Sequence, residues 1–217
     1  MEGDQKLNEA VLAELESEPS VNLEDIRISV RDGIATLTGS VSNYAEKLAA
    51  GHAVKRVAGL RGLAEDVLVK LPESSRRADT EIAAAALDAI TWMTSLPADS
   101  VRITVRDGWL SLDGTVGGWR QKRAAEEAVR NLAGLKGVTN LILIAPTAAP
   151  VDGKGAIEAA FKRHALLHAL HVQVDRKGGK VVLRGNVHSF IEREEAERAA
   201  WAAPGVTDVE NRIVLIS

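Results

Sequence analysis

Three histidines stand close together in the last third of the chain, at His164, His168 and His171. Their spacing of four and then three residues would stack the three imidazoles on one face of an uninterrupted helix. Zinc accepts three imidazoles in sites that keep a fourth position open. However, Val172 opens a segment that aligns with strands elsewhere in the chain, which favours a helix-to-strand connection at His168 and His171. Because a metal site requires ligand geometry as well as spacing, we expect solvated or locally hydrogen-bonded histidines and no metal.

Other chemically capable residues are better explained by turn geometry. Asp32-Gly33 and Asp107-Gly108 present carboxylates that could bind cations, but Gly tolerates the positive φ of a tight hairpin turn and Asp suits the position before it. Single glycines follow at Gly39, Gly114 and Gly185. They lack the clustering and the Lys-Ser/Thr partner of a phosphate loop. No nucleophile, base and orienting group recur together, so the sequence predicts no catalytic residue, no enzyme and no cofactor.

An internal repeat organises the chain. The segment 26–33, IRISVRDG, recurs at 101–108 as VRITVRDG. In both copies a glycine stands seven residues after the Asp, and another stands twenty residues later, at Gly59 or Gly134. A third copy has Gly185 and Gly205 at the same twenty-residue spacing. Such self-similarity must be recognised before elements are assigned, because each copy is one structural unit.

Each copy has the pattern helix, strand, strand, helix, strand. Alternating β-branched residues around the Asp-Gly pair predict a β-hairpin, with a longer turn over 175–180 in the third copy. Apolar residues spaced by three or four predict a helix after each hairpin and another before it. The apolar faces of the first helices are formed by Leu7, Val11, Leu12 and Leu15, by Ile82, Ala86, Leu87 and Ile90, and by Ile157, Ala160, Phe161 and Ala165. Last strands are predicted at 67–69, 141–144 and 213–216.

These patterns predict an α+β protein of three small domains in tandem. In each domain, two helices should pack on one face of a three-stranded mixed sheet, because a helix and a small sheet each need a partner for the apolar side. Proline-containing segments separate the copies and place the domains at 1–72, 77–146 and 151–217. With only 3% aromatic residues, the cores must be built mainly from aliphatic side chains.

Four aromatic residues are assigned structural roles by their place in the repeat. Tyr44, Trp119 and Phe190 stand five residues beyond the strand-ending glycines, which favours packing at the entry to the second helix. Trp109 occupies the strand position of Ile34, and we expect it in the core.

Two further tryptophans are not repeated. Trp201 takes a helix position held by Lys55 and Arg130, so it should point away from its own core. Trp92 replaces Ser17 of the first copy. Such residues either pack against another domain or contact a partner or lipid interface.

The start of the second helix in domain two combines an aromatic side chain with positive charge. Lys122 and Arg123 follow Trp119, a combination that suits a membrane interface, although a solvated helix end is the alternative. The candidate interaction surface therefore comprises Trp92, Met93, Trp119, Lys122, Arg123 and Trp201.

The motif that closes each copy carries a family resemblance. It reads GLRGL at 59–63, GLKGV at 134–138 and GVTDV at 205–209, and Asn140 and Asn211 follow it. Glu65 stands in place of this Asn in the first copy. Together with the hydrophobic strand, the Asp-Gly pair and the alternating strand, the motif resembles the BON domain of bacterial osmotically induced and nodulation proteins. The resemblance covers nearly the whole chain.

The resemblance implies binding to phospholipid surfaces or client proteins under osmotic or envelope stress, and it implies no enzymatic activity. Some cytoplasmic members of the family bind potassium. We therefore predict a non-catalytic binding protein whose partner is a phospholipid surface or a protein. The alternative is a cytoplasmic potassium-binding or potassium-responsive protein, in which loop carbonyl oxygens would coordinate the ion.

Charge and composition limit the remaining classes. The net charge of −3 with both signs interspersed gives no global positive field, so no nucleic-acid partner is predicted. No apolar run of about 18 residues predicts a transmembrane segment. The N-terminus resembles no signal peptide, which predicts a cytoplasmic protein, or a periplasmic one if the N-terminus is truncated. The sequence leaves the oligomeric state open.

Overall fold

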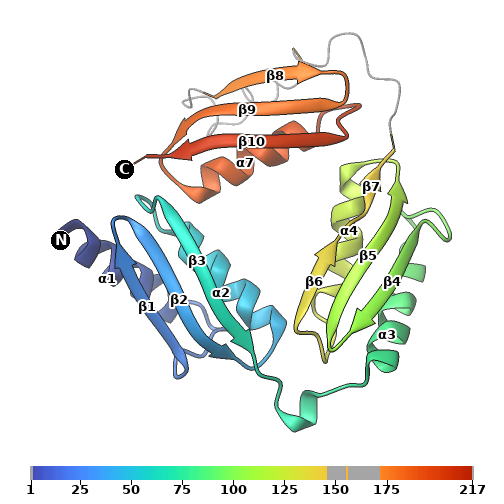
Figure 1. Cartoon of the computed structure of the whole chain (residues 1–217), viewed down its shortest axis with the longest axis horizontal. Helices are drawn as coiled ribbons and strands as arrows, with labels where there is room; N and C mark the ends of the chain where they lie inside the picture. Colours follow the sequence, from blue (N-terminus) through green and yellow to red (C-terminus); the bar gives the residue numbers. More distant parts are fainter. Residues whose placement is uncertain (1, 146–154, 156–171, 217) are drawn as a thin grey trace. The chain divides into compact units, whose positions relative to one another are not determined.

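The computed structural model describes residues 2–145, residue 155 and residues 172–216 (Figure 1). His164, His168 and His171 lie outside the described residues, as does the helix predicted at the start of the third repeat. The expectation that the histidines form no metal site therefore stays a prediction. The three repeats are described one at a time.

The first repeat has the predicted order of elements. They are α1 (Glu2–Glu16), β1 (Ile26–Arg31), β2 (Ile34–Val41), α2 (Tyr44–Arg56) and β3 (Gly62–Val69). The sheet has β2 in the middle, with β1 and β3 at its edges.

The second repeat follows a short 3-10 helix, η1 (Glu73–Ser75), and has the same plan. It consists of α3 (Asp79–Thr91), β4 (Val101–Arg106), β5 (Trp109–Val116), α4 (Trp119–Val129), β6 (Gly137–Asn140) and β7 (Leu143–Ile144). In the third repeat, the described elements are β8 (Gln173–Lys177), β9 (Lys180–Val187), α7 (Phe190–Trp201) and β10 (Asp208–Leu215).

The sheets of the second and third repeats are mixed, as predicted. β4 pairs with β5 antiparallel through the hairpin, whereas β6 and β7 run parallel to β5. Likewise β8 is antiparallel and β10 parallel to β9. Parallel neighbours require a crossover connection, and the second helix of each repeat supplies it. Figure 1 shows the described helices of each repeat on one face of its own sheet, so the α+β tandem fold is confirmed.

The core of the second repeat lies between its sheet and its two helices. Leu110 and Leu112 of the central strand are fully buried, and they pack with Ile82 of α3 and with Ala125 and Val129 of α4. The third repeat has a separate core of the same aliphatic character around Val181 and Leu183. Small aliphatic cores of this kind confirm the expectation from the aromatic-poor composition.

Two leucines assigned to the buried helix faces are exposed. Leu12 and Leu87 expose 40% and 56% of their surface, whereas the other three members of the Leu87 set, Ile82, Ala86 and Ile90, are buried. Leu87 follows Ala86 by one residue, which is about 100° around a helix, so it lies at the margin of the buried stripe. The apolar face of α3 is thus wider than the surface that its own core covers.

Trp109 was expected in the core and instead lies on the open face of its sheet, 52% exposed. Strand side chains alternate with a period of two, so Trp109 and the buried Leu110 must point to opposite faces. Its counterpart Ile34 is 47% exposed for the same reason. The Trp109 ring covers the backbone of Gly137, where a side chain would collide with it.

The hairpin turns are two residues long in all three repeats. Asp32 and Asp107 have φ of 52°, and the following glycines have φ of 74° and 80°, which is the type I′ pattern. The longer third turn expected from the sequence is wrong. Lys177 pairs directly with Lys180, so Gly178-Gly179 also makes a two-residue turn, in which Gly178 alone has a positive φ, of 60°.

A carboxylate at the start of the first helix holds the hairpin turn in the first two repeats. Asp4 accepts hydrogen bonds from the backbone N–H groups of Asp32 and Gly33 at 3.1 and 2.9 Å. Asp79 accepts the equivalent bonds from Asp107 and Gly108 at 2.8 and 2.9 Å. The repeated Asp-Gly pairs therefore serve the turn, which confirms their structural interpretation.

The hydrogen bonds between the Asp4 carboxylate and the turn make the stability of the first repeat depend on pH. The hydrogen bonds from the Gly33 and Asp32 N–H groups lower the pKa of Asp4 below its ordinary value of 3.8. The stabilisation is therefore complete above pH 3.8 and is lost as the pH falls through the lowered folded-state pKa. We expect Asp4→Asn to lower the melting temperature at pH 7, and the difference from the unmodified protein to shrink toward pH 2.

Circular dichroism melts across this pH range measure the effect. Glu16→Gln, which removes an exposed carboxylate at the other end of α1, is the control and should leave the acid dependence of the melt unchanged. A pH-independent difference between Asp4→Asn and the unmodified protein would contradict the role of the Asp4 charge.

Candidate functional site

The segment after α3 presents the most exposed tryptophan among the described residues. Trp92 is the C-cap residue of α3 and exposes 84% of its surface. Met93, the next residue, is half-buried and packs against the core of the second repeat. The Met93 side chain therefore anchors the chain at the point where the Trp92 indole projects into solvent.

The first turn of α4 holds the basic part of the predicted surface. Trp119 is the first residue of α4, and the Arg123 guanidinium carbon lies 5.4 Å from the centre of its ring, within the range of a cation–π contact. The Arg123 side chain also donates to Glu127 at 2.7 Å. Lys122 is half-buried beside them.

A hydrogen bond joins the segment after α3 to this helix turn. The Gln121 side-chain amide donates to the Ser95 carbonyl oxygen at 2.6 Å, and its own oxygen accepts from the Gly117 N–H at 2.8 Å. The structure therefore brings the Trp92-Met93 segment to the same end of the second repeat as Trp119, Lys122 and Arg123. We call these five residues the tryptophan end.

Trp201, the sixth predicted residue, behaves differently. It lies at the end of α7 and packs against the core of its own repeat, and its indole N–H donates to Glu197 at 3.4 Å. The expectation that it points away from its core is wrong. Lys55 and Arg130 are half-buried in their own repeats, so this helix position lies at the margin of the buried face, where the larger side chain of Trp201 contacts the core.

The predicted aromatic residues at the helix entries have the expected place. Tyr44, Trp119 and Phe190 are the first residues of α2, α4 and α7. Phe190 also packs against the core of its repeat, as predicted.

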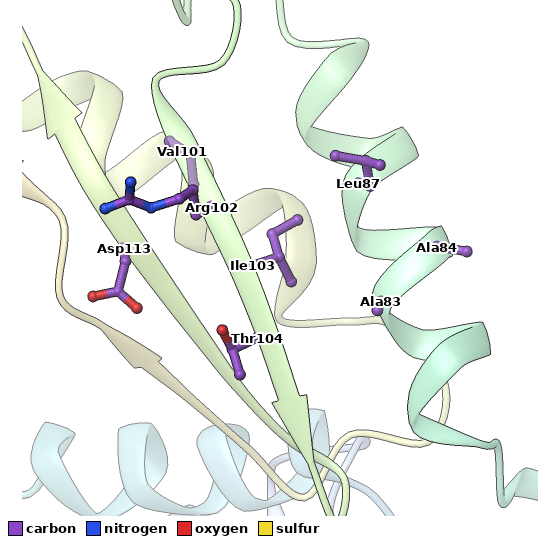
Figure 2. A pocket seen from close by; sticks show the side chains of 8 residues that line it. All are labelled: Ala83, Ala84, Leu87, Val101, Arg102, Ile103, Thr104 and Asp113. Carbon is purple, nitrogen blue, oxygen red and sulfur yellow. The ribbon is translucent and has the colours of Figure 1, made fainter.

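Sequence reasoning missed a groove along the edge of the second repeat. It has a volume of about 680 Å³ and lies between α3 and the edge strand β4 (Figure 2). The lining residues are Ala83, Ala84, Leu87, Val101, Arg102, Ile103, Thr104 and Asp113. One residue in the sequence indicated this groove: Leu87 follows the buried Ala86 directly and therefore lies at the margin of the buried face of α3.

The asparagine of the closing motif has a structural role. The Asn140 amide donates to the Lys122 carbonyl oxygen at 2.9 Å and to Glu126 at 3.1 Å. The Asn140 side-chain oxygen accepts from the Ile142 N–H at 3.2 Å. Asn211 makes the equivalent contacts with α7 and β10 in the third repeat. This side chain therefore ties the last strand to the second helix.

The first repeat also links its last strand to its second helix, but with the two residue types exchanged. Glu65 occupies the position of Asn140, and Gly51 occupies the position of Glu126. The Glu65 carboxylate lies directly over Gly51, where any side chain would collide with it. The carboxylate thus comes from the strand in this repeat and from the helix in the other two.

The residues that the structure describes include neither a cluster of metal-ligating side chains nor a membrane-spanning helix. In the residues that the structure describes, no group of three or more His, Cys, Asp or Glu side chains could hold a metal ion. None of the described helices is long and apolar enough to cross a membrane.

Comparison with solved structures finds periplasmic and secretion-system domains. One is the C-terminal domain of CdsD, the structural protein of the type III secretion system of Chlamydia trachomatis, with 14% identity over 97% of this chain and 98% of that chain and a TM-score of 0.26. Another is the periplasmic domain of the inner membrane protein PrgH from S. typhimurium, with 15% identity over 94% and 99% of the two chains and a TM-score of 0.22. Such low scores support no functional argument.

Comparison with families is decisive. A search of curated proteins found no match to this chain. The family model of the BON domain matches residues 3–70, 78–146 and 154–217, which is one match for each repeat. This protein therefore belongs to the BON domain family and carries three BON domains in tandem.

Proposed function

We propose that the protein is a non-catalytic binding protein that attaches to phospholipid surfaces through the tryptophan end of its second domain. BON domains bind phospholipids or proteins and are in general not catalytic. The observation that carries the proposal is Trp92, which exposes 84% of its surface on a chain with 3% aromatic residues. An indole combines a large apolar body with one N–H donor, and this combination suits the boundary between water and lipid.

The basic residues of α4 supply the second element of the site. Arg120, Lys122 and Arg123 follow Trp119 in the first turn of the helix. Cations held near an anionic membrane contribute about 1 kcal/mol each, and salt screens this attraction. The site should therefore prefer anionic vesicles at low salt, with Trp92 providing the part of the binding that salt does not remove.

The central test replaces tryptophans by the residues of the first repeat. Trp92→Ser should reduce the fraction of protein that floats with vesicles of phosphatidylglycerol and phosphatidylcholine by about tenfold, because the indole is the main apolar group that can enter the interface. Trp109→Ile is the matched control, since Trp109 is also exposed but lies on the open sheet face. It should float like the unmodified protein.

Tryptophan fluorescence provides an independent readout. Vesicles should shift the emission of the unmodified protein and of Trp109→Ile to shorter wavelength, and the shift should be lost in Trp92→Ser. Absence of flotation at low salt, or equal losses in both variants, would overturn the lipid proposal. In that case, suppression of client aggregation by the unmodified protein would favour the protein-binding role of the family.

The potassium-responsive alternative and the cytoplasmic location stay predictions. A titration with potassium against sodium, followed by melting temperature, tests the first. A selective rise with potassium would support it, and equal curves would contradict it.

A further inference from the structure

The edge strand of the second domain has one side without a partner. The order of the sheet is β4-β5-β6, so β4 lies at its edge, and no other described strand pairs with its outer side. An edge of this kind presents backbone N–H and C=O groups to any extended segment that can reach them.

The pairing pattern identifies which backbone groups face outward. The Thr115 N–H donates to the Ser100 carbonyl oxygen at 3.1 Å, and Arg106 pairs with Trp109 across the two-residue turn. In an antiparallel ladder, every second residue directs both backbone groups to its neighbour. Even-numbered residues of β4 therefore bond to β5, and Ile103 and Val105 turn their N–H and C=O groups to the free edge.

Apolar residues of α3 lie beside this edge. Figure 2 shows α3 running alongside β4, with Leu87 on the helix and Ile103 on the strand at the two sides of the groove. Leu87 is 56% exposed, and Ala83 and Ala84 leave the space below it open. A side chain placed opposite Ile103 on the helix side would bury apolar surface against Leu87.

The other face of β4 carries positive charge. Arg102, Thr104 and Arg106 are exposed on the open sheet face. Asp113 stands opposite Arg102 in the register, yet in the described part of the chain neither Arg102 nor Arg106 forms an ion pair. An incoming strand therefore meets two arginines, one near each end of β4.

This charge pattern decides between two possible occupants. If β4 paired antiparallel with a second copy of itself in the register that sets Ile103 opposite Val105, Arg102 of one chain would face Arg106 of the other, and like charges directly opposite each other destabilise a strand pair. An acidic residue at both places would instead gain from each contact. The groove thus fits an extended segment whose acidic and apolar residues alternate.

We propose that the groove between α3 and β4 binds an extended acidic peptide segment by adding it to the sheet as a further strand beside β4. The peptide backbone bonds to Ile103 and Val105. Its apolar side chains pack on Leu87 and Ala84, and its acidic side chains meet Arg102 and Arg106. This form of recognition draws affinity from main-chain bonds and specificity from alternate side chains.

The first domain is a natural control for this site. Its positions equivalent to Ala83 and Ala84 hold Asn8 and Glu9, which place polar bulk and a negative charge where the groove of the second domain is open. Because α1 folds with these residues, Ala83→Asn with Ala84→Glu should leave α3 folded while it closes the groove.

The test uses a labelled peptide with the complementary pattern, Glu-Val-Thr-Val-Glu-Leu, on the full chain. Fluorescence polarisation should show saturable binding, and the Ile103 and Val105 amides should gain protection from hydrogen exchange in NMR spectra. The double variant Ala83→Asn, Ala84→Glu should weaken binding by at least about tenfold. Trp92→Ser should leave it unchanged, which separates this site from the lipid proposal.

Two further arms test the backbone and charge contributions. Methylation of both valine nitrogens of the peptide should abolish binding, because these nitrogens would donate to the edge. The variant Arg102→Glu, Arg106→Glu should lose the acidic peptide and gain the peptide with Lys in place of Glu. Binding that tolerates N-methylation, or that is equal for both peptides on the unmodified chain, would overturn the proposal.

Discussion

Replacing Gly114 with alanine is expected to destabilise the second domain by about 3 kcal/mol or more, a large share of the stability of a domain this small. Gly114 has φ of 141°, a conformation that residues with a side chain rarely adopt. A methyl group at this position would also overlap the carbonyl oxygen of Ser100, which accepts the last hydrogen bond of the hairpin from Thr115. Strain and a broken contact therefore act together.

Hydrogen exchange measured by mass spectrometry localises this effect. Peptides covering β4 and β5 should lose protection in Gly114→Ala. Gly3→Ala provides the same chemical change in open space within α1, and there alanine should be neutral or stabilising by about 0.5–1 kcal/mol. Unchanged protection of β4 and β5 in Gly114→Ala would show that the loop before β4 can move away at little cost.

Asn140→Glu is expected to cost the second domain about 2–3 kcal/mol, because it places a carboxylate against Glu126 and removes the amide donors. The first domain indicates how to recover the loss. Adding Glu126→Gly recreates the arrangement of Glu65 over Gly51. Glycine inside α4 costs about 1 kcal/mol by itself, so recovery will be incomplete.

A double-mutant cycle measures the coupling between these two positions. The double variant should be more stable than the sum of the single changes predicts, by about 1–3 kcal/mol. Urea unfolding of the single and double variants provides the free energies of unfolding. Leu141→Ala, an exposed change next to Asn140, is the control and should alter stability little. Strict additivity would show that the exchange between the domains is incidental.

Most of the fold followed from the sequence because its signals were local and repeated. The Asp-Gly pair indicates a hairpin turn, the alternation around it indicates two strands, and the glycine twenty residues further on indicates the end of a helix. Their recurrence showed that the solution is shared. The carboxylates of Asp4 and Asp79, which clamp the turns, were not recognised, because 28 residues separate each one from the turn residue whose N–H it accepts.

Errors arose where one residue had to be placed on one of two faces. Trp109 was expected in the core at the strand position of Ile34, although the buried residue of each strand is the next one, Ala35 or Leu110, on the opposite face. Trp201 was placed by helix position alone. A helical wheel gives only the direction of the side chain and not its size, and the Trp201 side chain is large enough to contact the core from the margin of the helix face.

The candidate site was predictable in part. Five of its six residues come together at the tryptophan end, but the hydrogen bond from Gln121 to Ser95 that assembles them has no sequence signature. The groove beside β4 could not be read from the sequence, because it depends on the width of a gap between a helix and a strand edge. Alanines at 83 and 84 read as ordinary helix residues until their neighbours are known.

The open sheet faces give the three domains separate freedom to change. At one backbone position, directly after the turn, the chain has Ile34, Trp109 and Lys180, an aliphatic, an aromatic and a cationic side chain. Each follows a two-residue turn, and the residue after it, Ala35, Leu110 or Val181, is buried. In each strand the exposed residue can therefore change while the next, buried residue keeps the core apolar. As a result, three copies of one domain can diverge in what they bind and still keep the same fold.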